Sequence, residues 1–320
     1  MLMILNGKIR LYSLIKIGVC KAILIIENKN NKPLLLLEAC IGTRSGYGQH
    51  SRILLRGLIA MDKFEIVVFP TRWGNTPQTA LDPNDPEDQK ILSLIRQNLD
   101  RQPDVHIQVS IPSESSPKGK KNILISAGTE ASISPLSFIQ GCNLPDFTIV
   151  PSTFTRDVLL GTKYDKKNPQ TQQIEETIQV TKPIEVLFEG LETNVFDKNN
   201  VVKSDLTETL NAIKEKFGFL YVGHWLQGNL GQDRKDVSGL VHTFLRTFLK
   251  KKDRPCLILK TSGAGFSITE RDQIKEKINT IQEMVREEFQ WKGSLPTIHL
   301  LNGELTDEQM NELFNHPKVK

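Results

Sequence analysis

The sequence predicts an α/β protein made of two doubly wound domains, each a largely parallel sheet with helices on both faces. Its 320 residues are about twice the length of a typical domain. Short apolar segments typical of buried strands alternate with segments typical of helices along most of the chain. A polar stretch over residues 162–182 interrupts this alternation, and we expect the hinge between the domains at or just beyond it.

Residues 1–32 are expected to form an N-terminal extension outside the two domains. The apolar run over residues 11–26 contains Lys16 and Lys21, and it is shorter than the about 20 residues of a membrane-spanning helix. No small-residue cleavage site follows it, as a signal peptide would require. An extra strand or helix packed on the first domain and a peripheral contact of this basic segment with a membrane surface both fit its composition.

The first domain is expected over residues 33–183. It opens with PLLLLEAC, a continuous apolar run typical of a parallel strand buried on both faces. Further strands are expected over residues 65–70, 103–112, 121–128 and 146–152. Helices are expected over residues 51–61, 91–99, 134–142 and 153–161, and a Pro- and Asp-rich loop over residues 75–89.

The second domain is expected over residues 184–320. Its strands are expected over residues 184–190, 217–225, 255–262 and 296–303, and its helices over residues 204–217, 234–251, 268–289 and 306–316. Ser204 and Thr306 are typical caps for two of these helices. Doubly wound sheets bind ligands beyond the carboxyl ends of their strands, so we expect the ligand in a cleft between the domains.

Composition and missing motifs exclude several classes of protein. Charged residues make up 24% and apolar residues 38% of the chain, a balance that excludes a disordered protein. The net charge of +4 is too small to indicate a nucleic-acid partner. The four cysteines form no C-x-x-C pair, so neither a disulfide framework nor a zinc knuckle is indicated, and a reducing, cytoplasmic location is expected. There is no P-loop, nucleophile elbow, H-E-x-x-H or D-x-D pair, and we expect neither a metal nor another cofactor.

The loop after the first strand has the glycines of a ligand-binding turn. Gly46 and Gly48 would let the backbone approach a phosphate or a sugar at the start of a helix. Ser51 stands where the dinucleotide fingerprint needs a third glycine, and no acidic residue ends the second strand, so NAD is not expected. Plain turn chemistry remains the alternative. Glu130 follows a later strand, and it is either a contact for a sugar or acceptor hydroxyl or a simple acidic residue at a helix start.

Basic residues follow the strands of the second domain. His224 and Lys260 lie near the carboxyl ends of two expected strands. Arg234 and Lys235 are expected to open a helix, where the helix dipole disfavours cations. A bound diphosphate would resolve that conflict, whereas ordinary solvated surface charges would need no ligand.

Six short segments, taken together and in order, resemble glycosyltransferases of the GT-B type, which have two Rossmann-like domains facing a cleft. The similarity is to retaining family 4 and related phage-encoded enzymes. The segments are residues 45–51, 146–152, 189–196, 221–225, 233–235 and 301–305. The resemblance runs from about residue 34 to the end, and the first 32 residues have no counterpart in it.

The resemblance implies transfer of a sugar from a nucleotide-sugar donor to an acceptor hydroxyl of a glycan, protein or lipid, with retention and without a metal. The second domain would hold the donor, and His224 stands where many relatives carry an arginine at the phosphate. Glu130 is the implied catalytic candidate. The implied donor-binding residues are Gly46, Gly48, His224, Arg234, Lys235, Lys260, Gly303 and Leu305.

The end of the sequence departs from these enzymes. Similar enzymes continue with a further strand and a Gly-rich turn whose carboxylates bind the donor sugar, whereas this sequence stops at Asn315-His316-Pro317-Lys318-Val319-Lys320. We therefore expect an incomplete second domain with an unpaired sheet edge and weak or absent transfer. A non-catalytic protein that binds nucleotide sugars or carbohydrate, and a GT-B sugar epimerase or hydrolase, are the alternatives.

Overall fold

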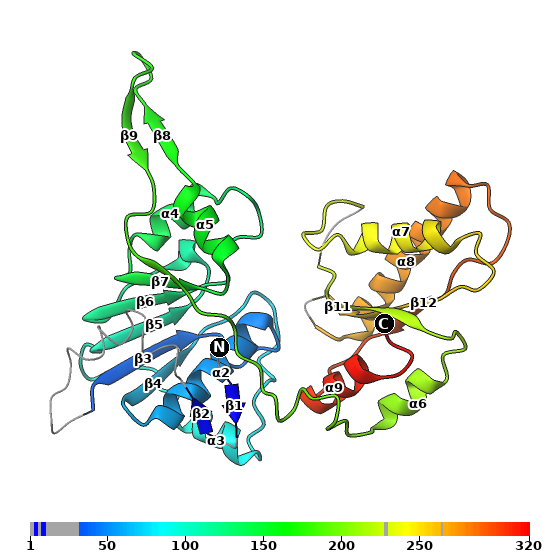
Figure 1. Cartoon of the computed structure of the whole chain (residues 1–320), viewed down its shortest axis with the longest axis horizontal. Helices are drawn as coiled ribbons and strands as arrows, with labels where there is room; N and C mark the ends of the chain where they lie inside the picture. The colour runs from blue at the N-terminus through cyan, green and yellow to red at the C-terminus, as the bar shows by residue number, and fades with distance from the viewer. Residues whose placement is uncertain (1–2, 6–7, 11–31, 227–229, 264) are drawn as a thin grey trace. The chain divides into compact units, whose positions relative to one another are not determined.

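The computed structural model describes residues 3–5, 8–10, 32–226, 230–263 and 265–320, and it divides into two compact units, Met1–Leu191 and Glu192–Lys320 (Figure 1). A small antiparallel pair of strands, β1 (Met3–Leu5) and β2 (Lys8–Arg10), precedes the first unit's main sheet. Most of the N-terminal extension lies outside the described residues, so neither a strand or helix packed on the first domain nor the alternative contact with a membrane surface is tested for it.

The first unit is built on a six-stranded parallel sheet with the order β10-β7-β6-β5-β3-β4. The strands are β3 (Leu34–Ala39), β4 (Glu65–Pro70), β5 (Val105–Val109), β6 (Lys121–Ile125), β7 (Phe147–Val150) and β10 (Ile184–Val186). The chain order reverses between β3 and β5, which is the switch point of a doubly wound sheet. The predicted Rossmann-like α/β class is therefore confirmed for this unit.

Most helices described in the first unit begin at a residue whose side chain caps them. They are α2 (Gly46–Met61), α3 (Pro86–Ser93), α4 (Leu136–Cys142) and α5 (Thr153–Gly161), with a 3-10 turn over Pro112–Glu114. The Ser45 side chain accepts from the Gly48 N–H at 3.0 Å, so α2 starts five residues before the expected Ser51. Asp85 caps α3 in the same way.

The helix expected over residues 91–99 is wrong beyond its first turn. α3 ends at Ser93, and the backbone that follows bonds to β4 instead. The Val68 N–H donates to the Leu94 carbonyl at 3.0 Å, and the Arg96 N–H donates to the Val68 carbonyl at 3.1 Å. The Leu94 carbonyl and the Arg96 N–H are therefore already bonded to β4, so they cannot form the hydrogen bonds of a continuing helix.

The segment expected as a hinge is a hairpin of the first unit. β8 (Tyr164–Lys167) and β9 (Ile174–Ile178) are antiparallel and project away from the sheet (Figure 1). The Tyr164 hydroxyl anchors the base of the hairpin by donating to the Ser134 carbonyl at 2.7 Å. The chain then returns to the first sheet as β10, parallel to β7. The division between the units therefore falls after Leu191 rather than at residues 183–184.

The second unit is a three-stranded parallel sheet with helices on both faces. Its strands are β11 (Gly218–His224), β12 (Cys256–Ser262) and β13 (Ile298–Leu301), in that order. Its helices are α6 (Asp205–Asn211), α7 (Val237–Phe248), α8 (Ile268–Glu288) and α9 (Asp307–Asn315). Leu257 and Leu259 pack toward α7 and α8, whereas Cys256 and Ile258 pack toward α6 and α9. This alternation gives the buried sheet that the apolar sequence of β12 predicts.

The last residues of the chain pair with the outer edge of β11. The Gly218 N–H donates to the Lys318 carbonyl at 2.7 Å, and the Lys320 N–H donates to the Gly218 carbonyl at 3.0 Å. Val319 faces Gly218 in a parallel bridge. The expected unpaired edge is therefore covered over the first residues of β11, because the chain after α9 runs back along it.

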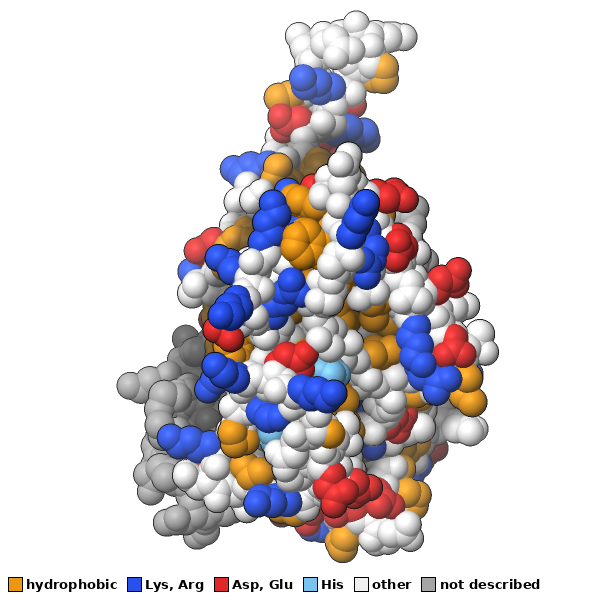
Figure 2. Space-filling model, turned by 90° about the vertical axis from the view of Figure 1, so that its right-hand side faces the viewer, with side chains coloured by type: hydrophobic (Ala, Val, Ile, Leu, Met, Phe, Trp, Pro, Cys, Tyr) orange, Lys and Arg blue, Asp and Glu red, His pale blue; other side chains and the backbone are white. Residues whose placement is uncertain are grey.

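The surface carries charges of both signs. On the face in Figure 2, Lys and Arg side chains are interspersed with Asp and Glu side chains. Glu288 of α8, for example, lies 3.1 Å from His242 Nε2 and 3.5 Å from Arg246 Nε. Such exposed pairs contribute little stability. None of the described helices combines the length and the apolar character needed to cross a lipid bilayer.

Glu38 of β3 forms a partly buried ionic cluster with His106 and Lys118 in the first unit. Its carboxylate lies 3.1 Å from His106 Nε2 and accepts from Lys118 Nζ at 2.8 Å. The Lys118 backbone N–H donates to His106 Nδ1 at 3.3 Å, which leaves Nε2 of the neutral ring to carry the proton. The hydrogen bond from His106 and the Lys118 ammonium lower the pKa of Glu38 below 4.5, although burial opposes the shift.

This cluster predicts that stability falls in acid and that Glu38→Gln removes part of that fall. A carboxyl whose folded pKa is lowered stabilises the protein above its unfolded pKa of about 4.3, and it loses that stabilisation as the pH falls through the folded value. Urea unfolding at pH 6 and pH 3.5 measures the difference. The matched control is Glu65→Gln at an exposed pair with Arg101, which should decline like the wild type. Equal declines for Glu38→Gln and wild type would contradict the assignment.

Candidate functional site

The carboxyl edge of the second unit gathers several of the residues that the sequence singled out. β11 ends at His224 and β12 at Ser262, and Gly223 and His224 lie opposite Thr261 and Ser262. Lys260 lies two residues before the end of β12, and Gly303 follows the end of β13. Parallel strands bring their carboxyl ends to one edge, which is where doubly wound sheets bind ligands.

His224 is oriented by the strand beside it. Its Nδ1 lies 2.8 Å from the Gly263 carbonyl and 3.4 Å from Ser262 Oγ. A carbonyl only accepts, so Nδ1 carries a proton and Nε2 is the acceptor of the neutral ring. The ring is half-buried at the end of β11. It can therefore present Nε2 to a ligand, as an acceptor when neutral and as a donor when protonated.

Because Gly223 has no side chain, the Tyr221 hydroxyl and the Lys235 ammonium can lie close to the end of β11. A Cβ at this position would stand 2.7 Å from the Tyr221 hydroxyl oxygen and 3.3 Å from Lys235 Nζ. The Tyr221 hydroxyl also donates to the His224 carbonyl at 3.4 Å. The ammonium of Lys235, an otherwise exposed residue, thus lies beside the glycine at the carboxyl edge of the sheet.

Arg234 and Lys235 precede α7 rather than opening it, so this expectation was wrong. The N-cap is Asp236, in a left-handed conformation with φ 44, and its side chain accepts from the Gly239 N–H at 3.1 Å. The Asp236 carboxylate supplies the negative charge that the helix start favours. The conflict between two cations and the helix dipole, which had suggested a bound anion, therefore does not exist. Arg234 is exposed in the same turn.

Lys260 is a buried cation that joins two strand ends. It is 9% exposed, and its Nζ donates to the Gly303 carbonyl at 2.6 Å. The ammonium also lies 4.9 Å from the centre of the Phe266 ring. Burial lowers the pKa of Lys260 from 10.5, and the nearby Glu304 carboxylate opposes this shift. Lys260 therefore fixes the turn after β13 instead of extending into solvent.

Leu305 is half-buried against the hydrophobic core of the second unit. It packs against the cluster that α6 and α9 form with β12, which includes Leu210, Ile258 and Leu313. This contact accounts for its apolar character without a ligand. The residues that the structure does bring together at the carboxyl edge are Gly223, His224, Lys235, Lys260 and Gly303.

At the carboxyl edge of the first unit, Tyr47 joins the start of α2 to two loops. Its hydroxyl accepts from the Ala127 N–H at 2.9 Å and lies 3.3 Å from Ser126 Oγ. Its ring stacks on Trp73, with ring centres 4.2 Å apart. These contacts connect α2 to the loops after β4 and β6. The sequence analysis included Tyr47 only within the segment of residues 45–51 and missed Trp73, although a Trp shortly after a strand and before Gly74 was a usable signal.

The two glycines of the first loop differ in what surrounds them. A Cβ on Gly48 would stand 2.1 Å from the Thr43 carbonyl oxygen, so this glycine is required by the fold of the loop. A Cβ on Gly46 would meet nothing within 4 Å, so the space beside it is open. Arg52 holds the loop from below, donating to the carbonyls of Ile41 at 2.9 Å and Thr43 at 2.7 Å.

Titratable groups flank this edge of the first unit. Burial lowers the pKa of His50 below 6.5, and the Glu189 carboxylate after β10 opposes the shift. His50 Nδ1 is buried without a hydrogen-bond partner among the described residues. Glu130, the sequence-predicted catalytic candidate, is exposed in the loop after β6. Glu189 had been noticed only as part of a longer motif.

Metal-ligating side chains lie together at the opposite edge of the second sheet. Among the described residues, one group of at least three His, Cys, Asp or Glu has the proximity to hold an ion, and it consists of Glu215, Cys256 and His299. None of the three is in the sequence-predicted site.

Each of the two units is a parallel, Rossmann-like α/β fold, and each carries candidate residues at the carboxyl edge of its sheet. Among solved structures, the chain resembles an α,α-trehalose 6-phosphate synthase from Burkholderia multivorans at 11% identity and a TM-score of 0.49, with 88% of this chain and 76% of that chain covered. The UDP-forming α,α-trehalose-phosphate synthase from Burkholderia vietnamiensis gives the same identity and coverage and a TM-score of 0.48. A glycosyltransferase from Rickettsia africae is 13% identical with a TM-score of 0.48, covering 89% and 71% of the chains. These are likenesses of fold. No family model and no curated protein matches the sequence.

Proposed function

We propose that the protein transfers a sugar from a nucleotide-sugar donor to an acceptor hydroxyl, with retention and without a metal. The observation that carries this proposal is the carboxyl edge of the second unit. There the Lys235 ammonium lies against Gly223, and the oriented ring of His224 ends the same strand. Cations beside a glycine at the carboxyl end of a parallel sheet suit the diphosphate of a nucleotide sugar.

The leaving group of this reaction is a nucleoside diphosphate, whose negative charge grows in the transition state. Lys235, with Arg234 in the same turn, would stabilise that charge from fixed positions, which removes the need for a metal ion. His224 would add a contact through Nε2. Lys260 would act on the donor indirectly, by holding the turn at Gly303. Retention and a donor contact near Gly303 are what the sequence resemblance implies.

The first unit would hold the acceptor, which is a hydroxyl of a glycan, protein or lipid. Its carboxyl edge offers the hydroxyls of Tyr47 and Ser126, the ring of His50 and the carboxylate of Glu130. The open space beside Gly46 would admit the reacting groups close to the backbone. Gly48 would support that loop from within.

Lys235→Ala is expected to weaken the binding of nucleoside diphosphates at least about tenfold, because a hydrogen bond to a charged group contributes about 1.5–3 kcal/mol. Calorimetric titration with UDP, GDP and ADP measures this. Lys250→Ala, an exposed lysine just after α7, is the matched control and should bind like the wild type. Lys260→Ala should weaken binding less, since its ammonium bonds to protein. Equal affinities for Lys235→Ala and wild type would refute the assignment.

The activity itself is tested with a panel of nucleotide sugars and of glycan, peptide and lipid acceptors, by following both release of the nucleoside diphosphate and formation of the glycosylated acceptor, with and without added Mg²⁺. Release that is independent of the added ion, with an unchanged anomeric configuration by NMR, is the expected result. Binding without release would favour the non-catalytic alternative, and a free or epimerised sugar would favour a hydrolase or epimerase.

A further inference from the structure

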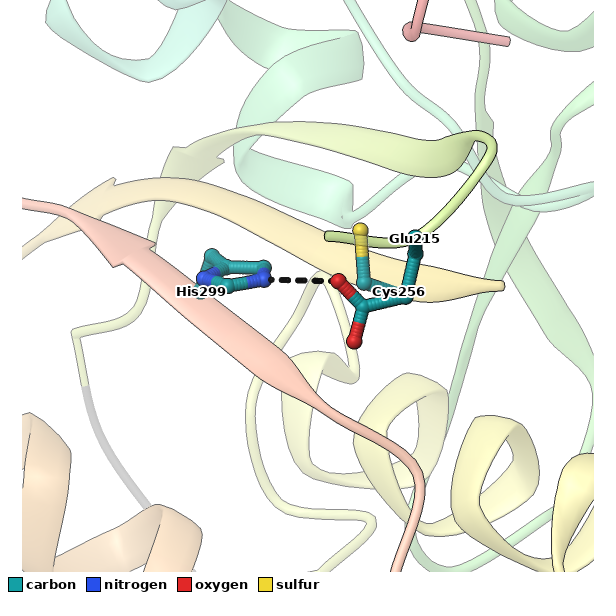
Figure 3. Close-up of side chains that lie close together, drawn as sticks. All are labelled: Glu215, Cys256 and His299. Carbon is teal, nitrogen blue, oxygen red and sulfur yellow. Dashed lines mark hydrogen bonds and ion pairs between the residues drawn. The ribbon is translucent and has the colours of Figure 1, made fainter. Parts of the chain in front are cut away.

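The amino edge of the second sheet brings together three metal-ligating side chains from separate segments (Figure 3). Glu215 lies in the turn before β11, Cys256 is the first residue of β12, and His299 is the second residue of β13. His299 faces Ile258 across the ladder, so it shares a sheet face with Cys256. The His299 Nε2 atom lies 3.4 Å from Glu215 Oε2, and one ligand atom from each residue lies within 4.8 Å of the others.

Space for the thiol is built into the neighbouring strand. Gly218 lies directly opposite Cys256, and a Cβ there would stand 2.6 Å from the sulfur. Any other residue at this position would displace the thiol. The thiol is itself fully buried, whereas the side chains of Glu215 and His299 are 17% and 31% exposed. The group is thus closed on the sulfur side and open to solvent on the imidazole side.

A nucleophilic triad is the competing explanation, and the geometry disfavours it. In a triad the imidazole stands between the thiol and the carboxylate. Here His299 Nε2 faces Glu215, and the sulfur lies 3.8 Å from the Phe217 carbonyl oxygen. Burial raises the pKa of the Cys256 thiol to about 11, so the free thiol is a poor nucleophile.

Sulfur, nitrogen and oxygen donors in one group suit Zn²⁺, which accepts all three with bond lengths of about 2.0–2.3 Å. Donor atoms in a tetrahedral site are then about 3–4 Å apart, which the imidazole and carboxylate already satisfy and which the thiol reaches by moving about 1 Å. We propose that Glu215, Cys256 and His299 bind one zinc ion, with water as the fourth ligand. The ion joins the starts of three strands at the edge opposite the proposed nucleotide site. We therefore expect the bound ion to stabilise the second unit, and its binding does not depend on the proposed function.

Cobalt substitution tests the site in the full chain. After treatment with a chelator, Co²⁺ should give the wild type a thiolate-to-metal charge-transfer band and tetrahedral d–d bands, and Zn²⁺ should abolish both. Cys256→Ser should show no charge-transfer band. His299→Gln, a change at a partly exposed ring that leaves the core intact, should lower the Co²⁺ affinity at least about 100-fold, more than the loss of an outer-shell partner.

The control variants remove other thiols. Cys142→Ser replaces a buried cysteine of the first unit, and Cys20→Ser replaces the one outside the described residues; both should keep the bands and the affinity. Zn²⁺ should also raise the unfolding temperature of the wild type and of both controls, but not that of His299→Gln. Absence of the charge-transfer band in the wild type, or its persistence in Cys256→Ser, would overturn the proposal. UDP affinity measured on His299→Gln should be unchanged, which keeps this test separate from that of the proposed function.

Discussion

Gly48→Ala should destabilise the first unit by about 3 kcal/mol, since an added methyl group must displace backbone in a closely packed loop. The new Cβ would lie 2.1 Å from the Thr43 carbonyl oxygen and 3.0 Å from the Cys40 carbonyl oxygen. Neither oxygen can move alone, because the Thr43 carbonyl is held by buried Arg52. The gain in helix propensity from glycine to alanine, about 1 kcal/mol, offsets only part of the cost.

Gly46→Ala is the matched control, two residues away in the same helix. Its Cβ would meet nothing within 4 Å, so we expect a gain of about 0.5–1 kcal/mol from reduced freedom of the unfolded chain. Hydrogen exchange of the β3 peptides, read by mass spectrometry, measures both variants in the same unit. Equal protection in Gly48→Ala and wild type would contradict the packing argument. If Gly46→Ala is stable but turns over more slowly, the open space beside Gly46 is where the substrates approach.

Glu312→Ala should cost the second unit about 3–4 kcal/mol, because it removes a buried carboxylate and leaves three half-buried donors without their acceptor. Glu312 of α9 is 2% exposed and accepts from the Ser204 N–H at 3.1 Å and the Ser204 hydroxyl at 2.6 Å. The Thr207 hydroxyl donates to its other oxygen. Since Ser204 is the N-cap of α6, this carboxylate holds the start of one helix from the side of another.

Tryptophan fluorescence during urea unfolding measures this loss. In a Trp73→Phe background the remaining tryptophans, Trp225 and Trp291, both lie in the second unit and report on it alone. Glu312→Gln keeps one acceptor oxygen and should lose about half as much. Glu308→Ala removes an exposed carboxylate from the same helix and should change stability by a few tenths of a kcal/mol. A loss in Glu312→Ala no larger than in Glu308→Ala would contradict the role assigned to this carboxylate.

The order of strands and helices could be predicted because it depends on local patterns. The strand over residues 65–70 has its predicted bounds, and Ser204 and Thr306 cap α6 and α9 as expected. The failures came from long-range pairing. The apolar pattern around Leu94 favours a helix, but the backbone there bonds to β4, and no local signal announces this partner.

The candidate site was predicted only in part, because strand ends depend on local patterns whereas contacts between distant residues do not. Strand ends follow from sequence, so the position of His224 and Lys260 at a carboxyl edge was within reach. The bond from Lys260 to Gly303 joins residues 43 apart, and the contact of His299 with Glu215 joins residues 84 apart. The predicted start of α7 was wrong because of one residue. Asp236 adopts a left-handed conformation, which excludes Arg234 and Lys235 from the helix.

The β8–β9 hairpin has a consequence for how the first unit is assembled. It sits in the connection between β7 and β10, two strands that pair directly with each other. The cohesion of this sheet edge comes from that pairing and from Ile184, which packs into the cluster with Ile139 and Leu159. The covalent link through the tip, near Gln172, adds little to it. We therefore expect the first unit to tolerate a cut in the backbone at this tip, with the two fragments held together by the pairing of β7 with β10.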